Sequence, residues 1–390
     1  MALLDSFGRE INQVLFEGNS CVKKVIFNRP RKFNSITIKM ILEMLKKLKE
    51  YEDDSTVKLV ILKGNGKAFC SGGDLKALYK HATEGHWTFG ALLYKKLLTL
   101  SHLLATYKKP LVALIDGTVM GAGAGLSMHA PYRIVTENTV FAMPEASVGL
   151  FPDIGASHFL SRLPKYFGEY LGLTGAKLDG AEMVACGLAT HFVLSKDLHL
   201  HMLENALEGL TSSDTTAISH IISKFEHKAS VKQDNAYYSR SKIVNKCFSR
   251  ETVEDIQLAL KKEAAANWET NWIVDAINSM KSACPASLKI FLRMMKEGRN
   301  RSLEHCLTLE YIVHCHIIRE TLNSEFYEGV RAKLLHKDKK PKWRPSKLEL
   351  VSEEMVDQFF RIMDDGNWEP LQLTPTTFNS FIIDAARPKL

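Results

Sequence analysis

Two short apolar runs, each leading directly into a glycine-bearing loop, constrain the fold more than any other feature of this sequence. Residues 57–62 (VKLVIL) precede the loop 64–74 (GNGKAFCSGGD), and residues 110–115 (PLVALI) precede the loop 116–125 (DGTVMGAGAG). Such runs are typical of strands buried on both faces, as in a parallel sheet. Loops of these sheets carry functional residues. The sequence therefore predicts an α/β protein with its site at these loops.

The remainder of the chain divides into a part with strands and helices and a part that is mainly helical. Hydrophobic spacing predicts strands at 22–28, 133–136 and 140–143, and helices at 36–48, 256–265, 288–295 and 303–318. We predict a core at 12–200, a helical C-terminal region at 201–350 and a tail at 351–390 with a candidate targeting signal.

Charge and cysteine usage narrow the class of protein. The 390 residues carry 51 basic and 44 acidic side chains, and the net charge of +7 is spread along the chain, which favours anionic ligands. We expect no nucleic acid partner.

The seven cysteines form no C-x-x-C pair. This indicates neither a disulfide framework nor a zinc-binding motif, and it fits a reducing compartment. No apolar run is long enough to predict membrane insertion.

Three motifs together carry a family resemblance, although either glycine loop alone is also compatible with a simple strand-to-helix turn. They are AFCSGGDL at 68–75, DGTVMGAGAGL at 116–126 and FAMPEASVGLFPDIG at 141–155. Neither loop fits a dinucleotide or P-loop fingerprint. In order and spacing the three resemble the crotonase (enoyl-CoA hydratase/isomerase) superfamily, and segments 189–192, 328–332 and 341–343 resemble its 3-hydroxyisobutyryl-CoA hydrolase branch.

The resemblance covers residues 14–345 and implies a fold and an activity. The fold is a crotonase-type spiral of ββα repeats with a mainly helical C-terminal region. The activity is a cofactor-independent thioesterase that converts 3-hydroxyisobutyryl-CoA, or a similar short β-hydroxyacyl-CoA, to the free acid and CoA in valine catabolism. CoA enters only as part of the substrate.

The resemblance also implies roles for four residues of these loops. The backbone N–H groups of Gly73 and Ala122 form an oxyanion hole for the thioester carbonyl. Glu145 and Asp153 are the catalytic carboxylates. One activates water or attacks the acyl carbon, and the other orients the substrate hydroxyl or assists proton transfer to the departing thiolate. Which residue does which is left open.

Three positions depart from the patterns of the superfamily. Hydratases carry a second glutamate at the position of Gly125, and its loss argues against hydration. The hydrolase branch carries a substrate-binding Glu where this chain has Leu97, and Ala122 replaces a glycine of the oxyanion loop. Two alternatives therefore stay open: an enoyl-CoA hydratase or isomerase, and a catalytically silent acyl-CoA-binding paralogue.

Further residues are expected to bind substrate or CoA. They are Lys32 after the first strand, Asp74 at the end of the first glycine loop, Leu97 ahead of the strand 110–115, and Lys337 in the C-terminal segment. Lysine side chains suit CoA phosphates, although a solvated surface is the alternative for both lysines. We expect no metal site, because His314 and His316 are two apart on a predicted helix and point to different faces.

The last expectations concern assembly and location. Relatives in the hydrolase branch have C-terminal helices that fold back on their own core, which favours a monomer. The final residues Pro388-Lys389-Leu390 resemble the C-terminal tripeptide that the peroxisomal import receptor recognises. We therefore expect a peroxisomal protein, with the cytoplasm as the alternative.

Overall fold

A computed structural model describes residues 12–199, 201–228, 237–266 and 271–373. The candidate targeting signal, Pro388-Lys389-Leu390, lies outside the described residues, so its prediction is untested. The division into a core, a helical region and a tail also stays a prediction.

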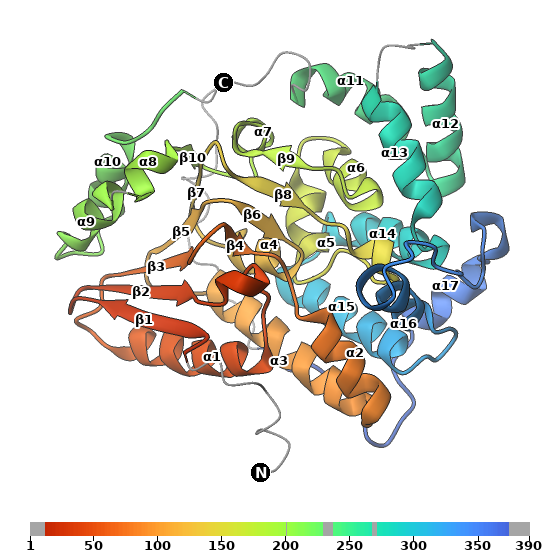
Figure 1. Ribbon diagram of the computed structural model, residues 1–390, viewed down its shortest axis with the longest axis horizontal. Coiled ribbons are helices and arrows are strands. Elements are labelled where there is room, and N and C mark those ends of the chain that lie inside the picture. Colours follow the sequence, from red (N-terminus) through yellow and green to blue (C-terminus); the bar gives the residue numbers. More distant parts are fainter. Residues whose placement is uncertain (1–11, 200, 229–236, 267–270, 374–390) are drawn as a thin grey trace.

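Within the described residues, ten strands form two sheets that lie side by side (Figure 1). The six-stranded sheet has the order β1-β2-β3-β5-β7-β10, and the four-stranded sheet has the order β4-β6-β8-β9. The strands are β1 Val14–Gly18, β2 Val22–Phe27, β3 Leu59–Gly64, β4 Ala68–Cys70, β5 Leu111–Ile115, β6 Thr118–Met120, β7 Tyr132–Val135, β8 Val140–Ala142, β9 Leu178–Asp179 and β10 His191–Phe192.

Helices surround the sheets and dominate the chain beyond β10. They are α1 Ile38–Asp53, α2 Leu75–Glu84, α3 Trp87–Ala105, α4 Ala122–Ser127, α5 Ala156–Phe159, α6 Phe167–Thr174, α7 Gly180–Cys186, α8 Ser195–His199, α9 Met202–Glu208, α10 Thr215–Ser223, α11 Tyr237–Phe248, α12 Val253–Ala266, α13 Asn271–Ser282, α14 Pro285–Gly298, α15 Leu303–Ile318, α16 Glu325–Val330 and α17 Glu353–Phe359. Across the described residues, every helix is too short or too polar to cross a lipid bilayer.

Alternation along β3 explains why the large sheet is covered on both faces. Val60 and Leu62 belong to the main core, which includes Met40 and Met44 of α1. Leu59 and Ile61 belong to a second cluster, together with leucines and isoleucines of α8, α9 and α10. Because successive side chains point to opposite faces, a continuous apolar strand can bury both faces.

The predicted α/β class with a mainly helical C-terminal region is confirmed, with one difference in strand direction. The contacts β2–β3, β3–β5, β5–β7 and β7–β10 are parallel, whereas β1 and β9 pair in the antiparallel sense. The strand β1 reaches β2 through a tight turn, with Gly18 at φ +106°. A short turn forces antiparallel pairing, since a parallel pair needs a crossover.

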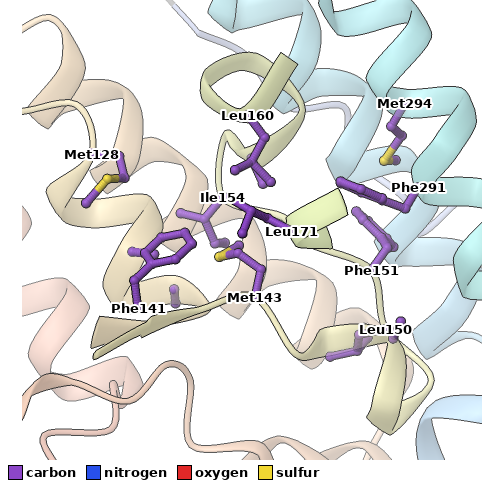
Figure 2. Packing of buried hydrophobic residues seen from close by; sticks show 14 of the residues in the cluster. Met128, Phe141, Met143, Leu150, Phe151, Ile154, Leu160, Leu171, Phe291 and Met294 are labelled. Carbon is purple, nitrogen blue, oxygen red and sulfur yellow. The ribbon is translucent and has the colours of Figure 1, made fainter. Parts of the chain in front are cut away.

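The C-terminal helices pack against the loop that follows β8. In Figure 2, Phe151 of this loop lies beside Phe291 of α14, and both belong to the main core. The Cys284 N–H, just before α14, donates to the Ala146 carbonyl at 2.9 Å. A Cβ atom on Gly329 of α16 would lie only 2.3 Å from the Val148 carbonyl carbon. This packing fixes the loop from Glu145 to Asp153.

Candidate active site

A cavity of about 320 Å³ lies where the glycine loops meet the loop after β8. Six of the eight predicted site residues line it: Gly73, Asp74, Leu97, Ala122, Glu145 and Asp153. The other two, Lys32 and Lys337, are exposed and do not line the cavity. The fold therefore brings together residues from three loops and from α3.

The two glycine loops approach each other closely at the cavity. A Cβ atom on Gly72 would lie 3.3 Å from the Met120 carbonyl oxygen and 3.7 Å from the Ala122 nitrogen. The first loop is held by Ile36, whose N–H donates to the Gly72 carbonyl at 2.8 Å. Within the described residues, the N–H groups of Gly73 and Ala122 donate no hydrogen bond to the protein. Two backbone donors are thus left for a ligand oxygen.

Glu145 begins the short 3-10 helix η2 (Glu145–Val148) and is buried beside the second glycine loop. A Cβ atom on Gly121 would lie 2.8 Å from Glu145 Oε1, so the carboxylate sits directly over this glycine. Neither carboxylate oxygen has a hydrogen-bond partner among the described residues. Burial, with a smaller contribution from the negative charge of Asp153, raises the pKa of Glu145 well above its usual range.

Asp153 is also buried, and an unusual turn presents it to the cavity. The next two residues, Ile154 and Gly155, have φ values of +56° and +84°. A β-branched residue such as Ile154 rarely adopts this region, and such strain is typical of functional sites. Burial, together with the nearby charge of Glu310, raises the pKa of Asp153 to about 8.

Glu310 of α15 anchors this turn, and the sequence analysis did not identify it. Its carboxylate accepts hydrogen bonds from Gly155 N–H at 2.8 Å and from Ser157 Oγ at 2.7 Å. Burial raises the pKa of Glu310 to about 7. The sequence did contain a sign that Glu310 is buried. Hydrophobic spacing predicts a helix at 303–318, and Glu310 lies on the same face of it as Leu303 and Leu307, which are both buried.

Tyr94 and His314 form a second feature of the cavity that the sequence analysis missed. The two rings stack with their centroids 3.6 Å apart and their planes at 9°. Both side chains line the cavity. The Tyr94 hydroxyl is close enough to Asp153 to oppose the rise in its pKa, but it forms no hydrogen bond of normal length and angle within the described residues.

The structure explains why Gly125 has no room for the glutamate that the hydratases carry at this position. A Cβ atom at this position would lie 2.4 Å from the Ile154 Cβ and 2.6 Å from the Ile154 carbonyl oxygen. Contacts this short require the backbone after Asp153 to move. Glu145 and Asp153 therefore have no acidic partner from α4 in this cavity.

Asp74 lies in the cavity wall, but its carboxylate is already engaged by the protein. Arg29 Nη1 contacts Asp74 Oδ2 at 3.2 Å, and the Ala77 N–H donates to Asp74 Oδ1 at 3.3 Å. The second contact caps the N-terminus of α2, as an aspartate commonly does. Arg29 also donates to the Ser35 carbonyl at 2.7 Å. These contacts shape the first glycine loop.

One lysine of the C-terminal segment lines the cavity in place of the predicted one. Lys333 and Leu334 belong to a short π-helix at Arg331–Leu335 that reaches the cavity wall. Lys337 lies two residues beyond this helix and is exposed. A binding role for Lys32 and Lys337 stays a prediction, since neither side chain belongs to the cavity.

No cluster of three or more His, Cys, Asp or Glu side chains able to hold a metal ion occurs in the part of the chain that the structure describes. His314 faces Tyr94, whereas His316 Nε2 lies 2.8 Å from the Arg361 carbonyl oxygen. The two histidines thus lie in different environments.

Comparisons with known proteins show the family of this chain. The sequence model of the enoyl-CoA hydratase/isomerase family matches residues 22–360. A 3-hydroxyisobutyryl-CoA hydrolase from Arabidopsis thaliana is 48% identical, over 90% of this chain and 91% of the relative. A small ribosomal subunit protein from the same plant is 38% identical, over 90% of this chain and 84% of the relative.

The fold comparison points the same way. The crystal structure of a carnitinyl-CoA dehydratase from Mycobacterium thermoresistibile superposes with a TM-score of 0.82 and 28% identity, covering 93% of this chain and 99% of that chain. The predicted crotonase-type fold is thereby confirmed. The chain belongs to the enoyl-CoA hydratase/isomerase family, in the part of it that includes 3-hydroxyisobutyryl-CoA hydrolases.

Proposed function

We propose that this protein is a thioesterase that hydrolyses 3-hydroxyisobutyryl-CoA, or a similar short β-hydroxyacyl-CoA, in valine catabolism. The observation that carries the proposal is the pair of buried carboxyls, Glu145 and Asp153, in one cavity with two unused backbone N–H groups. The names of relatives at 48% identity support the choice of substrate.

In the proposed mechanism, the N–H groups of Gly73 and Ala122 bind the thioester oxygen and stabilise the negative charge that develops on it. Glu145, beside Ala122, acts as a carboxylate: because its pKa is raised, it must first release its proton, and it then attacks the acyl carbon or takes a proton from the attacking water. The raised pKa of Asp153 keeps this carboxyl protonated near neutral pH, which suits a proton donor to the departing thiolate. The C–S bond breaks, water adds its hydroxyl to the acyl group, and the products are the acid and CoA thiol.

Hydration of an enoyl-CoA is a weaker candidate. The hydratases that the sequence resembles add water across the double bond with the help of a glutamate at the position of Gly125. The close contact with Ile154 leaves no room for that side chain. The cavity therefore favours hydrolysis over hydration.

The test is thiol release from 3-hydroxyisobutyryl-CoA by the purified protein, followed with a thiol reagent. Release that is at least 100-fold weaker in Glu145→Gln, with CoA-ester binding retained, supports the proposal. Hydration of crotonyl-CoA without thiol release indicates a hydratase, and binding without either reaction indicates a silent paralogue. Either result would overturn the proposed thioesterase.

The two departures from the hydrolase branch have their own test. Leu97→Glu and Ala122→Gly restore the residues of that branch at the cavity wall. A large gain in thiol release on restoring them would mean that this chain has drifted from the ancestral reaction. Unchanged or lower release would mean that the present cavity is adapted to its own acyl group.

We propose that Lys333 in the cavity wall and the exposed Lys32 and Lys337 bind the CoA moiety. Lysine binds phosphate as a point charge, and such contacts weaken with salt. Lys333→Ala should raise KM for the acyl-CoA more than it lowers kcat. Matching substitutions at Lys32 and Lys337 show whether these exposed lysines contribute.

For the location, we propose the peroxisome, through recognition of Pro388-Lys389-Leu390 by the import receptor. The test is a reporter fused in front of residues 381–390, compared with the same reporter lacking Leu390. Punctate fluorescence that is lost on removing Leu390 supports import, whereas diffuse fluorescence from both reporters contradicts it.

A further inference from the structure

The proposed reaction leaves three polar atoms of the cavity wall without a role. They are the two ring nitrogens of His314, which have no hydrogen-bond partner within the described residues, and the Tyr94 hydroxyl, which lies near Asp153 but makes no hydrogen bond of normal length and angle there. Both side chains are deeply buried, with 3% of Tyr94 and 2% of His314 exposed. Leaving a buried polar group without a partner destabilises a protein, so two such side chains in one cavity point to a ligand that supplies the missing partners.

The protonation of the pair limits the chemistry of that ligand. Burial lowers the pKa of His314 to about 3, so the imidazole is neutral at physiological pH, with one N–H donor and one acceptor nitrogen. Burial also raises the pKa of Tyr94 well above its usual range, so its hydroxyl stays protonated. Asp153 and Glu310 lie close enough to raise the Tyr94 pKa further, and whenever either carboxyl is ionised its negative charge repels an anion. A neutral group that both donates and accepts fits best.

The surrounding wall limits the size and shape of the ligand. Leu93 and Leu97 lie on the same helix as Tyr94, and Leu150 and Ile154 flank Asp153. These side chains are apolar and branched, which suits a short carbon skeleton rather than a second polar group. An alcohol on a short branched acyl chain therefore matches both the apolar wall and the unpaired polar atoms.

We propose that Tyr94 and His314 form a hydroxyl-recognition site that selects acyl groups carrying an alcohol. In this arrangement the stacked rings hold the hydroxyl by hydrogen bonds and position the acyl carbon for Glu145 and Asp153. The inference rests on the proposed function, because it names the residues that recognise the β-hydroxyl of the substrate. It leaves both carboxyls free for the chemistry, and it gives Tyr94 and His314 a role in specificity.

The experiment compares two ligands that differ only in the hydroxyl. They are the non-hydrolysable thioether analogues of 3-hydroxyisobutyryl-CoA and isobutyryl-CoA, whose affinities are measured by calorimetry. Because unpaired polar groups reject a ligand that lacks the matching hydroxyl, the wild type should bind the hydroxylated analogue about 10- to 100-fold more tightly. Tyr94→Phe and His314→Phe keep the stacked rings and remove the polar atoms, and each should bring the ratio close to one.

The matched control is His316→Phe, a buried histidine on the same helix that does not line the cavity. It removes the contact with the Arg361 carbonyl and should cost stability while the affinity ratio is kept. A ratio near one in the wild type, or a ratio preserved in both cavity variants, overturns the inference. A purely structural role would weaken both analogues equally and would also overturn it. If His314→Phe fails to fold, the affinity ratio of Tyr94→Phe alone tests the inference.

Failure of the proposed function gives a different result. Absence of thiol release by a wild type that still prefers the hydroxylated analogue contradicts the thioesterase and supports the recognition site. Thiol release at equal rates from 3-hydroxyisobutyryl-CoA and isobutyryl-CoA, together with an affinity ratio near one, supports the thioesterase and contradicts the recognition site.

Discussion

At the scale of single residues, the site holds carboxyls that the fold makes difficult to ionise. Burial raises the pKa of Glu145 well above its usual range, that of Asp153 to about 8 and that of Glu310 to about 7. Each of these groups stays protonated in the folded protein at a pH where the unfolded chain has released the proton. The protein is therefore expected to lose stability as the pH rises from about 4 toward 8.

The first prediction concerns Asp153→Asn, which keeps the shape of the side chain and removes its proton equilibrium. In the wild type, this one group lowers the free energy of unfolding by about 1.4 kcal/mol for each pH unit between the unfolded and folded pKa values. The melting temperature of the variant relative to the wild type should therefore increase from pH 5 to pH 8. Thiol release should fall at least 100-fold.

Differential scanning fluorimetry at the two pH values measures the stability effect. Asp364→Asn is the control, because Asp364 is exposed and does not line the cavity. It should change the melting temperature equally at pH 5 and pH 8. An equal change in Asp153→Asn would contradict the raised pKa of that carboxyl.

The second prediction compares two glycines with positive φ. Gly121 has φ +50° and lies against Glu145 Oε1, whereas Gly187 has φ +86° and a Cβ atom there would meet nothing within 4 Å. Gly121→Ala and Gly187→Ala should both lose about 1–2 kcal/mol of stability through backbone strain. Only Gly121→Ala displaces the carboxylate, so only this variant should also lose kcat, by about 10- to 100-fold.

Thermal melts and initial rates of thiol release check this comparison. Equal kcat values for the two variants would show that the position of Glu145 over Gly121 does not matter for turnover.

At the scale of elements, α15 shapes the site from about 150 residues away in sequence. It contributes Glu310, which holds the turn after Asp153, and His314, which stacks on Tyr94 of α3. A helix can do this because its i, i+4 positions lie on one face, and that face packs on both α3 and the turn. The acidity of Asp153 thus depends on a neighbouring element.

The third prediction is that Glu310→Gln lowers the pKa of Asp153, because it removes the negative charge that helps to raise it. The limb of the pH–rate profile that Asp153 controls should move to lower pH. The glutamine retains a single acceptor for the Gly155 and Ser157 donors, so kcat should also fall about 10-fold through looser positioning.

Rates measured from pH 5 to pH 10 give the profile. Glu304→Gln is the matched control, since Glu304 lies in the first turn of the same helix, 3.3 Å from His102 Nε2. A profile that shifts equally in both variants would show that the effect does not come from the charge beside Asp153.

At the scale of the whole molecule, the C-terminal helices use their apolar faces within the chain. Phe291 and Met294 of α14 belong to the same core as Leu160 and Leu171, and Figure 2 shows them converging there. The helix α15 packs along α3. Faces that are already buried within one chain are not available to a second copy.

The fourth prediction is therefore that the protein is a monomer. Sedimentation equilibrium should give a mass near 43.9 kDa at micromolar concentration. A mass near two or three times this value, stable on dilution, would contradict the prediction and point to an interface outside these helices.

The sequence by itself determined the features that depend on local pattern. The continuous apolar runs become β3 and β5, because a strand that is apolar on both faces is stable only in a sheet whose two faces are both covered. The period of three to four residues in 303–318 becomes α15 with those same bounds. The motifs around Gly73, Ala122 and Glu145 indicated the family, because their spacing is fixed by turns within each loop.

Only the tertiary structure decided which distant groups meet. It paired Asp74 with Arg29, brought Lys333 rather than Lys337 to the cavity, and put Glu310 behind Asp153. It also placed Tyr94 against His314, across 220 positions of sequence. Hydrophobic periodicity in the sequence indicates which face of a helix or strand is buried, but the residues that this face contacts depend on how the whole chain packs. The pKa of a carboxyl depends on those neighbours, and so the chemistry of this cavity follows from contacts that no local pattern contains.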